Sequence, residues 1–415
     1  MSSFRHLYTH VRTYGLKHRH LYLFSTVLLF WSIFDGIISY ITPIVITGEG
    51  LSKTAMGIIY ASSSVFGALF DIGISGIIKK PHFRRLFLLM FIVSFIHPLL
   101  LWQAKSVFIY LIAMASWGMY YDLLGFGSYD FVSRKMAPEE HASSFGVIDV
   151  FRGIGHVIAP VLAGLVIVAL VDWKIYSLAW GFLLISLSVF ISLLVYLKIH
   201  HFEYLRPQKE STMSFFKQLH IWRGLIKFAF PILGVFLFIN IYDAFFWTIG
   251  PLFSEQFRTI HSLNGMFMAA YSLPVLLFGW LTGQIEKSLG KSKAIYLSLF
   301  LCSLVLLLFK FFENNPIVLF ALVFATSTFS VIAIIVAKGA FTDLILKKQN
   351  LENELEALGD MSVNIGYVIG PVSAGFLADK TGNMESFVVL GIVGIMVSLF
   401  LWLVPKKFYA SGNHS

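Results

Sequence analysis

The sequence predicts an all-α membrane protein with twelve transmembrane helices, arranged as two related bundles of six. Three observations support this fold class: the composition, the number of long apolar runs, and a pattern of polar residues that repeats in the second half of the chain. The chain has 415 residues, of which 57% are hydrophobic and 13% are charged. Soluble domains are charged at about 25% of positions, and single cores stop growing beyond about 250–300 residues. A chain this long and this apolar therefore needs lipid as its solvent.

The same composition excludes several classes of protein. A cytosolic enzyme and a disordered chain both need far more polar residues. The single cysteine, Cys302, cannot form an internal bridge, which excludes a disulfide-stabilised secreted domain. The net charge of +9 comes from basic residues in short loops and not from a basic stripe, so we expect no nucleic-acid partner. Because no HExxH, Gly-x-Ser-x-Gly, Walker or paired metal-ligand motif is present, we expect no enzyme, cofactor or metal site.

Twelve apolar runs are long enough to cross a bilayer, which requires roughly 20 residues of helix for about 30 Å of hydrocarbon. The runs cover residues 21–46, 53–78, 84–103, 106–132, 140–170, 174–198, 224–253, 261–286, 292–312, 316–345, 353–378 and 384–404.

Lysine and arginine residues in the loops predict the orientation of these runs. With the N-terminus placed in the cytoplasm, the inside segments hold 23 of these residues and the outside segments hold 6. Such an excess is typical of cytoplasmic loops. We therefore expect a multi-pass protein of the cell (inner) membrane, monomeric, with both termini cytoplasmic. The polar stretch 199–223 is then a cytoplasmic linker between an N-terminal bundle over 1–198 and a C-terminal bundle over 224–415.

Polar residues repeat between the two halves of the chain. The first and seventh runs each hold an Asp followed eight residues later by a Pro (Asp35 and Pro43; Asp243 and Pro251). The fifth and eleventh runs share four residues at a constant offset of 211: Asp149, Gly155, Pro160 and Gly164 recur as Asp360, Gly366, Pro371 and Gly375. Glycine and proline recur in many membrane helices, but the two Asp pairs indicate a duplication of six spans, a known plan of secondary transporters.

Short motifs follow the second and eighth runs. The first motif combines Gly-x-x-x-Asp with a basic loop and consists of Gly67, Asp71, Lys79, Lys80, Arg84 and Arg85. The second motif holds two glycines, Gly279 and Gly283. Together with the two six-span halves, the chain resembles the major facilitator superfamily (MFS) of secondary transporters over nearly its whole length. The resemblance implies a cytoplasmic gate formed by Gly67, Asp71, Arg84, Arg85, Gly279 and Gly283.

The fifth run holds a series of small residues: Gly146, Gly155, Ala159, Pro160, Ala163 and Gly164. The series looks like a degenerate antiporter motif of the MFS, with two glycines replaced by alanine. In the fourth run, the arginine that such exporters carry would fall at Tyr121. Small residues four apart share one helix face and let a neighbouring backbone approach closely, and a proline bends the helix. The motif therefore predicts tight helix packing, and alternatively a seam that also seals the transport path.

Ionisable side chains lie inside the predicted spans: Asp35, Asp122, Asp149, Arg152, Asp243, Lys338 and Asp360, with His97 and His156. Each charged group near the bilayer centre costs roughly 2.5–3.5 kcal/mol when it faces lipid. They are therefore expected to face a wet cavity or one another, except that His97 is expected to be structural. Asp130, Asp343 and Asp379 fall near span ends, where solvation is an alternative.

Helical spacing then selects candidates for the site. Asp35 and Asp243 are the first choices for proton coupling, since neither has a cation on its own helix, and Asp122 is the third. The candidates for the substrate cavity are Arg152, His156, Asp149, Asn240, Trp247, Trp117, Tyr121, Lys338, Asp360, Asn364 and Tyr367.

Each group also has a purely structural alternative. An Asp149–Arg152 pair, or Lys338 paired with Asp360 or Asp343, would only fix helix packing. Asp35 and Asp243 would then cap kinks at the prolines that follow them.

The resemblance implies a secondary active transporter that moves a small organic solute by alternating access. A desolvated carboxylate binds a proton more readily, which favours proton coupling. The motif in the fifth run favours efflux of drugs or metabolites by antiport. The missing arginine at Tyr121 favours uptake symport with H⁺ or Na⁺ instead. An alternative of a different class is a membrane sensor or scaffold that moves no solute. The expected partners are a small-molecule substrate, H⁺ or Na⁺, and the lipid bilayer.

Overall fold

The computed structural model describes residues 18–77, 82–137, 140–167, 171–200, 215–257, 265–278, 282–347 and 351–403. All regular elements in these ranges are helices. The α-helices are α2 (Arg19–Gly48), α3 (Lys53–Ile77), α4 (Phe83–Gln103), α5 (Val107–Lys135), α6 (His141–Val166), α7 (Trp173–His200), α8 (Phe215–Ser254), α9 (Met266–Phe278), α10 (Thr282–Leu289), α11 (Lys291–Leu308), α12 (Pro316–Lys347), α13 (Glu352–Thr381) and α14 (Asn383–Leu403). Two short 3-10 helices, η2 (Glu255–Phe257) and η4 (Phe309–Phe312), follow α8 and α11.

These helices confirm the predicted fold class. In the described ranges, 10 helices are long and apolar enough to cross a membrane, and the bent pair α9 and α10 forms an eleventh candidate. Helix α3, with 25 residues, corresponds to the remaining predicted run but is not among these candidates. The seventh predicted run begins at residue 224, whereas α8 already begins at Phe215, so the helix extends into the segment that was assigned to the linker.

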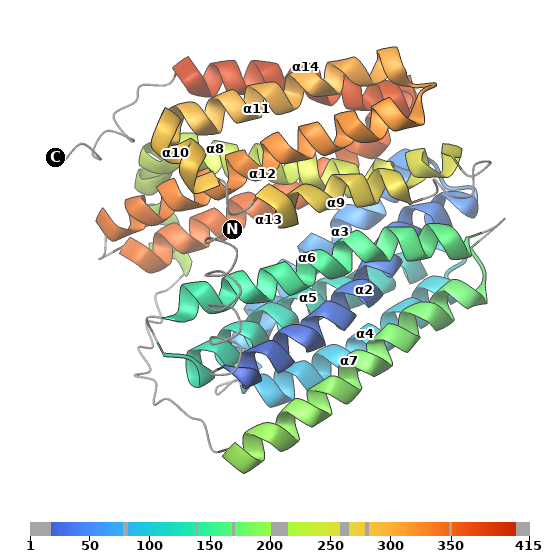
Figure 1. Ribbon diagram of the computed structural model, residues 1–415, viewed down its shortest axis with the longest axis vertical. Helices are drawn as coiled ribbons and strands as arrows, with labels where there is room; N and C mark the ends of the chain where they lie inside the picture. Colours follow the sequence, from blue (N-terminus) through green and yellow to red (C-terminus); the bar gives the residue numbers. More distant parts are fainter. Residues whose placement is uncertain are drawn as a thin grey trace, which may run out of the picture.

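The two halves of the chain lie side by side in Figure 1, with α2–α7 in blue to green and α8–α14 in yellow to red. Helices of the two halves meet along two seams, α3 against α13 and α6 against α9. We call the end of the molecule where α2 begins and α14 ends the terminal face, and the opposite end, where α2 ends and α3 begins, the distal face. The terminal face is the one predicted to be cytoplasmic.

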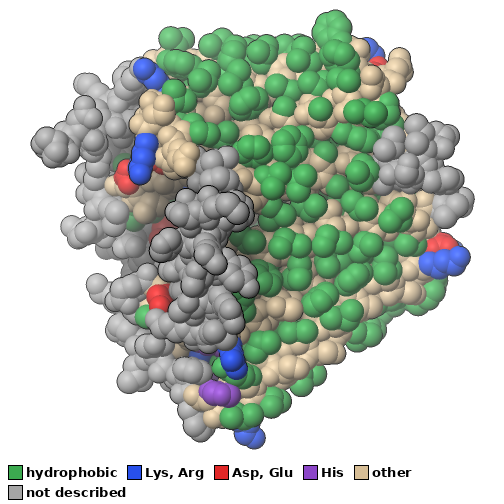
Figure 2. Space-filling model, in the orientation of Figure 1, with side chains coloured by type: hydrophobic (Ala, Val, Ile, Leu, Met, Phe, Trp, Pro, Cys, Tyr) green, Lys and Arg blue, Asp and Glu red, His purple; other side chains and the backbone are tan. Residues whose placement is uncertain are grey.

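Apolar side chains cover the sides of the molecule. Figure 2 shows a broad hydrophobic surface between two ends that carry the charged side chains. Ile92, Val195 and Met396, each more than half exposed, belong to this surface. An apolar band bounded by charged ends is what a helix bundle needs in order to lie in a bilayer.

Small residues allow close helix packing in both halves. A Cβ atom at Gly155 of α6 would lie 2.7 Å from the carbonyl oxygen of Leu29 in α2. A Cβ atom at Gly366 of α13 would lie 2.9 Å from the carbonyl oxygen of Leu237 in α8. Because lipid tails are as apolar as leucine, such close van der Waals packing is the main attraction between membrane helices. The predicted packing role of the small-residue series thus holds at Gly155, and its counterpart Gly366 packs in the same way.

Candidate functional site

Asp35 lies in the middle of α2 and is completely buried. Its carboxylate accepts two hydrogen bonds from neighbouring tyrosines of α5, at 2.7 Å from the hydroxyl of Tyr120 and at 2.5 Å from the hydroxyl of Tyr121. Trp31, one turn before Asp35, packs edge-to-face on both tyrosine rings. Hydrogen bonds to a carboxylate are roughly twice as strong as neutral ones. The alternative role of Asp35 as a cap for a kink at Pro43 is therefore not what the contacts show.

Asp243 occupies the equivalent position in the second half, in the middle of the apolar span Ala229–Phe257 that α8 contributes, and two tyrosines hold it as well. The hydroxyl of Tyr271 in α9 and the hydroxyl of Tyr367 in α13 each donate to its carboxylate at 2.5 Å. The two aspartates of the repeat therefore share one environment, a carboxylate between two tyrosine hydroxyls. The helices that supply these hydroxyls differ between the halves.

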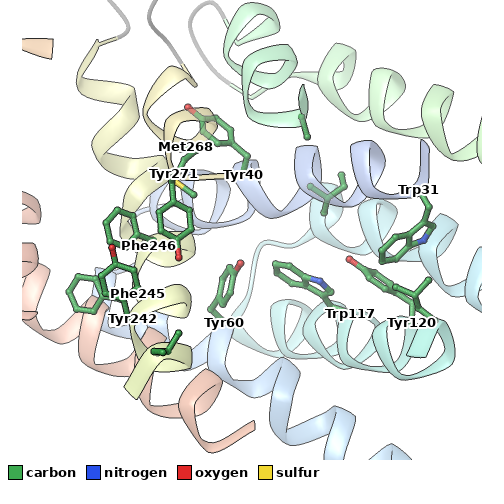
Figure 3. Packing of buried hydrophobic residues seen from close by; sticks show 14 of the residues in the cluster. Trp31, Tyr40, Tyr60, Trp117, Tyr120, Tyr242, Phe245, Phe246, Met268 and Tyr271 are labelled. Carbon is green, nitrogen blue, oxygen red and sulfur yellow. The ribbon is translucent and has the colours of Figure 1, made fainter. Parts of the chain in front are cut away.

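Tyr60 of α3 connects the two aspartates. It is buried and lies within electrostatic range of both Asp35 and Asp243. Figure 3 shows its ring between Trp117 of α5 on one side and Tyr271 on the other. Its ring centroid lies 4.9 Å from that of Trp117, in an edge-to-face contact. Carboxylates from the two halves thus meet around one aromatic residue at the centre of the protein.

Arg152 of α6 is the basic residue of this centre. It lies within electrostatic range of Asp35 and of the hydroxyls of Tyr121 and Tyr367. Its Nε atom is buried and has no hydrogen-bond partner among the described residues. An ion pair between Arg152 and Asp149 is absent from the described contacts, and Asp149 is exposed.

His156 lies one turn beyond Arg152 and contacts the other half of the chain. Its ring meets the indole of Trp247 in α8 edge-to-face, with centroids 6.0 Å apart. Its Nδ1 atom is buried without a hydrogen-bond partner in the described part of the chain. His97, by contrast, is completely buried, and its Nδ1 atom lies 2.8 Å from the carbonyl oxygen of Ala113, which fits the structural role expected for it.

We define the central site as the residues of the two halves that surround Tyr60. It consists of Asp35, Tyr60, Trp117, Tyr120, Tyr121, Arg152, His156, Asp243, Trp247, Tyr271 and Tyr367. Tyr60, Tyr120 and Tyr271 were not among the sequence candidates. An available signal was the aromatic pair at 120 and 121 directly before Asp122, whereas Tyr60 and Tyr271 lie outside the repeated positions.

The other predicted cavity residues lie elsewhere. The side-chain amide of Asn240 donates to the carbonyl oxygen of Phe236 in its own helix, at 2.7 Å. Asp149, Asp360 and Asn364 are exposed on the terminal halves of α6 and α13. Tyr129 of α5, itself exposed, lies within electrostatic range of both Asp149 and Asp360. Exposed polar side chains of α5, α6 and α13 therefore lie near one another towards the terminal face.

Lys338 is exposed on α12 and forms no ion pair with any residue that the structure describes. The acidic partner suggested for it, Asp343, binds Lys291 instead, at 2.5 Å.

The predicted gate residues occupy the terminal half of α3 and its surroundings. Gly67 packs against Asp122, because a Cβ atom at Gly67 would lie 2.9 Å from Asp122 Oδ2. Asp122 and Asp71 lie within electrostatic range of each other, and each has one buried carboxylate oxygen without a described partner. Asp122 thus belongs to this group and not to the central site. Arg84, Arg85 and Gly283 are exposed, and Gly279 lies outside the described residues.

Asp130, for which solvation was an alternative, is 6% exposed. Its carboxylate accepts from the backbone N–H of Phe83 at 2.8 Å and from Arg134 Nε at 2.8 Å. Buried carboxylates require such partners, and Asp130 satisfies the unpaired N–H at the start of α4. Spacing along one helix does not report the distance between α4 and α5, so this contact is a finding of the structure.

The distal face is closed by contacts between the halves. Asp379 of α13 accepts from the backbone N–H groups of Lys53 and Thr54, at 3.1 and 2.7 Å, and from the hydroxyl of Thr54 at 2.6 Å. Lys53 Nζ also donates to Asn383 Oδ1 at 2.6 Å. The carboxylate of one half therefore caps the first turn of α3 in the other half. We call the contacts of Asp379 with Lys53 and Thr54 the distal latch.

A glycine–proline contact lies in each of the two seams. A Cβ atom at Gly57 of α3 would lie 2.2 Å from the carbonyl oxygen of Pro371 in α13. A Cβ atom at Gly265, just before α9, would lie 2.0 Å from the carbonyl oxygen of Pro160 in α6. Both prolines belong to the repeated series of small residues. The distal part of this series therefore forms the seams between the halves, whereas Gly146 near the terminal face contacts nothing within 4 Å.

Metal binding is not indicated by the side chains in the ranges that the structure describes. No group of three or more His, Cys, Asp or Glu residues is placed there to hold an ion. The chemistry of the central site is that of carboxylates, hydroxyls, one guanidinium and aromatic rings.

Comparisons with known proteins identify the family. The model of the Major Facilitator Superfamily matches residues 2–160, 131–348 and 246–414. No curated protein matches the chain significantly. Among solved structures, similar ones include a bacterial homologue of the human lysosomal transporter Spinster in an inward-facing, unoccupied conformation (12% identity, TM-score 0.67, covering 93% of this chain and 96% of that one).

Two further solved structures are similar to this chain over nearly the whole length of both chains. They are the nucleoside transporter NupG (14% identity, TM-score 0.68, covering 92% of this chain and 98% of that one) and a POT family transporter with a bound peptide conjugate (14% identity, TM-score 0.69, covering 94% and 96%). At these identities the likeness establishes the fold alone. The family match extends over almost all of the sequence, and the chain is an integral, multi-pass membrane protein that belongs to the Major Facilitator Superfamily.

Proposed function

We propose that this protein is a proton-coupled secondary active transporter of a small organic solute. The observation that carries the proposal is the environment of Asp35 and Asp243. Each lies at mid-span, each comes from one half of the repeat, and each carboxylate is held by two tyrosine hydroxyls, with Arg152 in electrostatic range of Asp35. Polar groups this deep in the bilayer are costly and mark substrate or proton paths.

Alternating access fits the contacts at the two faces. The distal latch and the glycine–proline contacts hold the halves together at the distal face. At the terminal face, Asp149, Asp360 and Asn364 are exposed between them. Rocking of two bundles over 1–198 and 224–415, joined by the linker 199–223, would close the terminal face and break the distal contacts. We assign the terminal face to the cytoplasm of a cell (inner) membrane, and the working unit is a monomer.

The tyrosines favour H⁺ over Na⁺ as the coupling ion. A hydroxyl that donates to a carboxylate stabilises it without offering a cation ligand, and a bound Na⁺ would need several oxygen atoms turned towards it. Proton transfer needs only that a carboxylate exchange between a charged and a neutral state. Asp35 and Asp243 are the proposed carriers.

The direction of transport rests on the small-residue series of α6. In this family such a series favours export by antiport, and here its distal part closes the seams between the halves. The second candidate is uptake symport. It is favoured by Tyr121, which stands where exporters carry an arginine and donates to Asp35 instead. Opposite orientations of the pH gradient distinguish the two.

The test uses purified full-length protein in proteoliposomes with an imposed pH gradient. Accumulation of radiolabelled uridine, alanyl-alanine and benzoate is measured for the wild type, Asp35→Asn and Asp243→Asn. We expect gradient-driven accumulation of at least one solute in the wild type and its loss in both variants. Asp172→Asn, which changes an exposed carboxylate before α7, is the matched control. Accumulation that persists in both central variants overturns the proposal.

A further inference from the structure

Arg152 stands out at the central site because it lacks a bonded partner. Asp35 and Asp243 each accept two tyrosine hydroxyls. Within the described residues, Arg152 forms no hydrogen bond and no ion pair, and its Nε atom is buried. Buried charged groups are normally paired. The side chain of Arg152 is half-buried as a whole, so its buried Nε–H is the group that gains most from a ligand at the central site.

The chemistry of a guanidinium selects the ligand. Its planar fork of N–H donors matches a carboxylate, which it binds through two parallel hydrogen bonds. The buried Nδ1 atom of His156, one turn away, also has no described partner. Both unpartnered groups lie on α6. The ring of His156 contacts Trp247 of α8, and Arg152 lies within electrostatic range of Asp35 in its own half and of Tyr367 in the other. A ligand that bridges the halves would meet Arg152 first.

Aromatic rings of both halves surround the guanidinium. Trp247 of α8 is half-buried and contacts His156. Tyr60 and Trp117 form an edge-to-face pair on the side of Asp35. Flat apolar ligands pack on such rings, whereas sugars and short peptides need many more polar partners.

We infer that the central site binds planar organic anions of the aromatic carboxylate class, with the carboxylate on Arg152 and the ring against Trp247. This inference rests on the proposed function, since it names the class of solute for the same site. A cationic ligand would instead need a carboxylate that other donors do not already stabilise. Both central aspartates already hold two donors each, and a cation would also meet the positive charge of Arg152.

The experiment compares three probes of one shape and different charge: benzoate, benzamide and benzamidinium. Binding to purified full-length protein in detergent is measured by the shift of the unfolding temperature and by equilibrium dialysis. We expect benzoate to bind about tenfold tighter than benzamide or more, and benzamidinium to bind weakest. Arg152→Gln should abolish the preference for benzoate, and Arg152→Lys should keep part of it.

Two further variants separate charge recognition from general damage. Lys174→Gln removes an exposed positive charge in the first turn of α7 and should leave all three affinities unchanged. Trp247→Leu should weaken all three probes by a similar factor while the order of affinities is kept. Unfolding temperatures without ligand show that the variants are folded.

The inference is overturned if benzamidinium or benzamide binds as tightly as benzoate, if benzoate does not bind at millimolar concentration, or if folded Arg152→Gln keeps the preference. Each of these results leaves the proposed proton-coupled transport standing, because that is tested by gradient-driven accumulation in the Asp35 and Asp243 variants. If Asp35→Asn and Asp243→Asn keep gradient-driven accumulation while benzoate still binds through Arg152, the proposed proton coupling is overturned and the inferred ligand class stands.

Discussion

Tyr367 and His156 occupy equivalent positions of the repeat, 211 residues apart in α13 and α6, but only Tyr367 donates a hydrogen bond to the central aspartate of its own half. His156 keeps a buried Nδ1 atom without a described partner and turns its ring to Trp247 of the other half. Tyr120 and Tyr121 of α5 supply both hydroxyls to Asp35 instead. The duplicated halves therefore preserve the carboxylate environment and differ in the helices that build it. The freed position on α6 became part of the surface between the halves.

Tyr367→Phe should lower the stability of the protein more than His156→Phe. The first change removes a hydrogen bond to the half-buried carboxylate of Asp243, and a hydrogen bond to a charged group contributes about 1.5–3 kcal/mol. The second removes no described hydrogen bond. Unfolding of both variants in detergent by denaturant or heat measures the difference. Equal losses of stability would show that the Tyr367 hydroxyl adds nothing to the site.

Asp379→Ala should open the distal face. Asp379 caps the first turn of α3 across the two halves. Removal of a helix N-cap costs about 0.5–2 kcal/mol, which changes the ratio of distal-closed to distal-open molecules by about 2–30-fold. Spin labels at positions 49 and 380, both exposed at the distal face, report the distance distribution between the halves.

Lys310→Gln is the control for the distal latch. Lys310 also forms ion pairs at the distal face, with Glu313 and Glu385, but all three residues belong to the second half of the chain. Exposed pairs contribute only about 0–1 kcal/mol, and this one does not join the halves. A shift of the distance distribution in Lys310→Gln as large as that in Asp379→Ala would refute the latch.

Gly57→Ala should also separate the distal ends. The added methyl group would lie 2.2 Å from the carbonyl oxygen of Pro371, which is backbone and cannot turn away. Gly181→Ala is the matched control, since nothing lies within 4 Å of its added methyl group. In a helix, alanine is favoured over glycine by about 1 kcal/mol, so the control should be neutral or stabilising. The same pair of spin labels gives the readout, and an unchanged distance distribution in Gly57→Ala would contradict the close contact.

Asp130→Asn should destabilise the first half of the protein. Its carboxylate is buried, caps the start of α4 and pairs with Arg134. Breaking a buried, hydrogen-bonded charge costs about 3–5 kcal/mol. Asp343→Asn breaks the exposed pair with Lys291 and should cost about 0–1 kcal/mol. The two free energies of unfolding are compared in the same detergent, and similar values would mean that Asp130 is effectively solvated.

The sequence allowed the helices to be predicted well, because a bilayer demands long apolar runs and each run is read independently of the others. The start of α8 is the exception. Phe215 lies in a stretch that is polar on average, and hydropathy does not predict the part of a helix that extends beyond the bilayer. The repeat of Asp35 and Asp243 was equally visible, because both are charged residues in apolar runs.

The partners of these aspartates were harder to predict. Tyr271 and Tyr60 are ordinary tyrosines in apolar helices, and only the packing of α9 and α3 brings them to the centre. The contacts of Asp379 were hard to predict for a different reason. Its side chain is exposed, as expected for a span end, but its bonds reach residues more than 300 positions away in the sequence. Contacts between the halves depend on how the helices of the two halves pack, and the spacing of residues along one helix does not predict that packing.

The most direct measurement for the central aspartates is the proton movement that accompanies solute movement. A pH-sensitive dye is trapped in proteoliposomes without an initial pH gradient, and a solute that the wild type accumulates is added on one side. We expect the solute gradient to drive protons across the membrane in the wild type and in Asp172→Asn. In Asp35→Asn and Asp243→Asn the solute should move no protons. A dye signal of wild-type size in both central variants would contradict a role for these carboxylates in coupling.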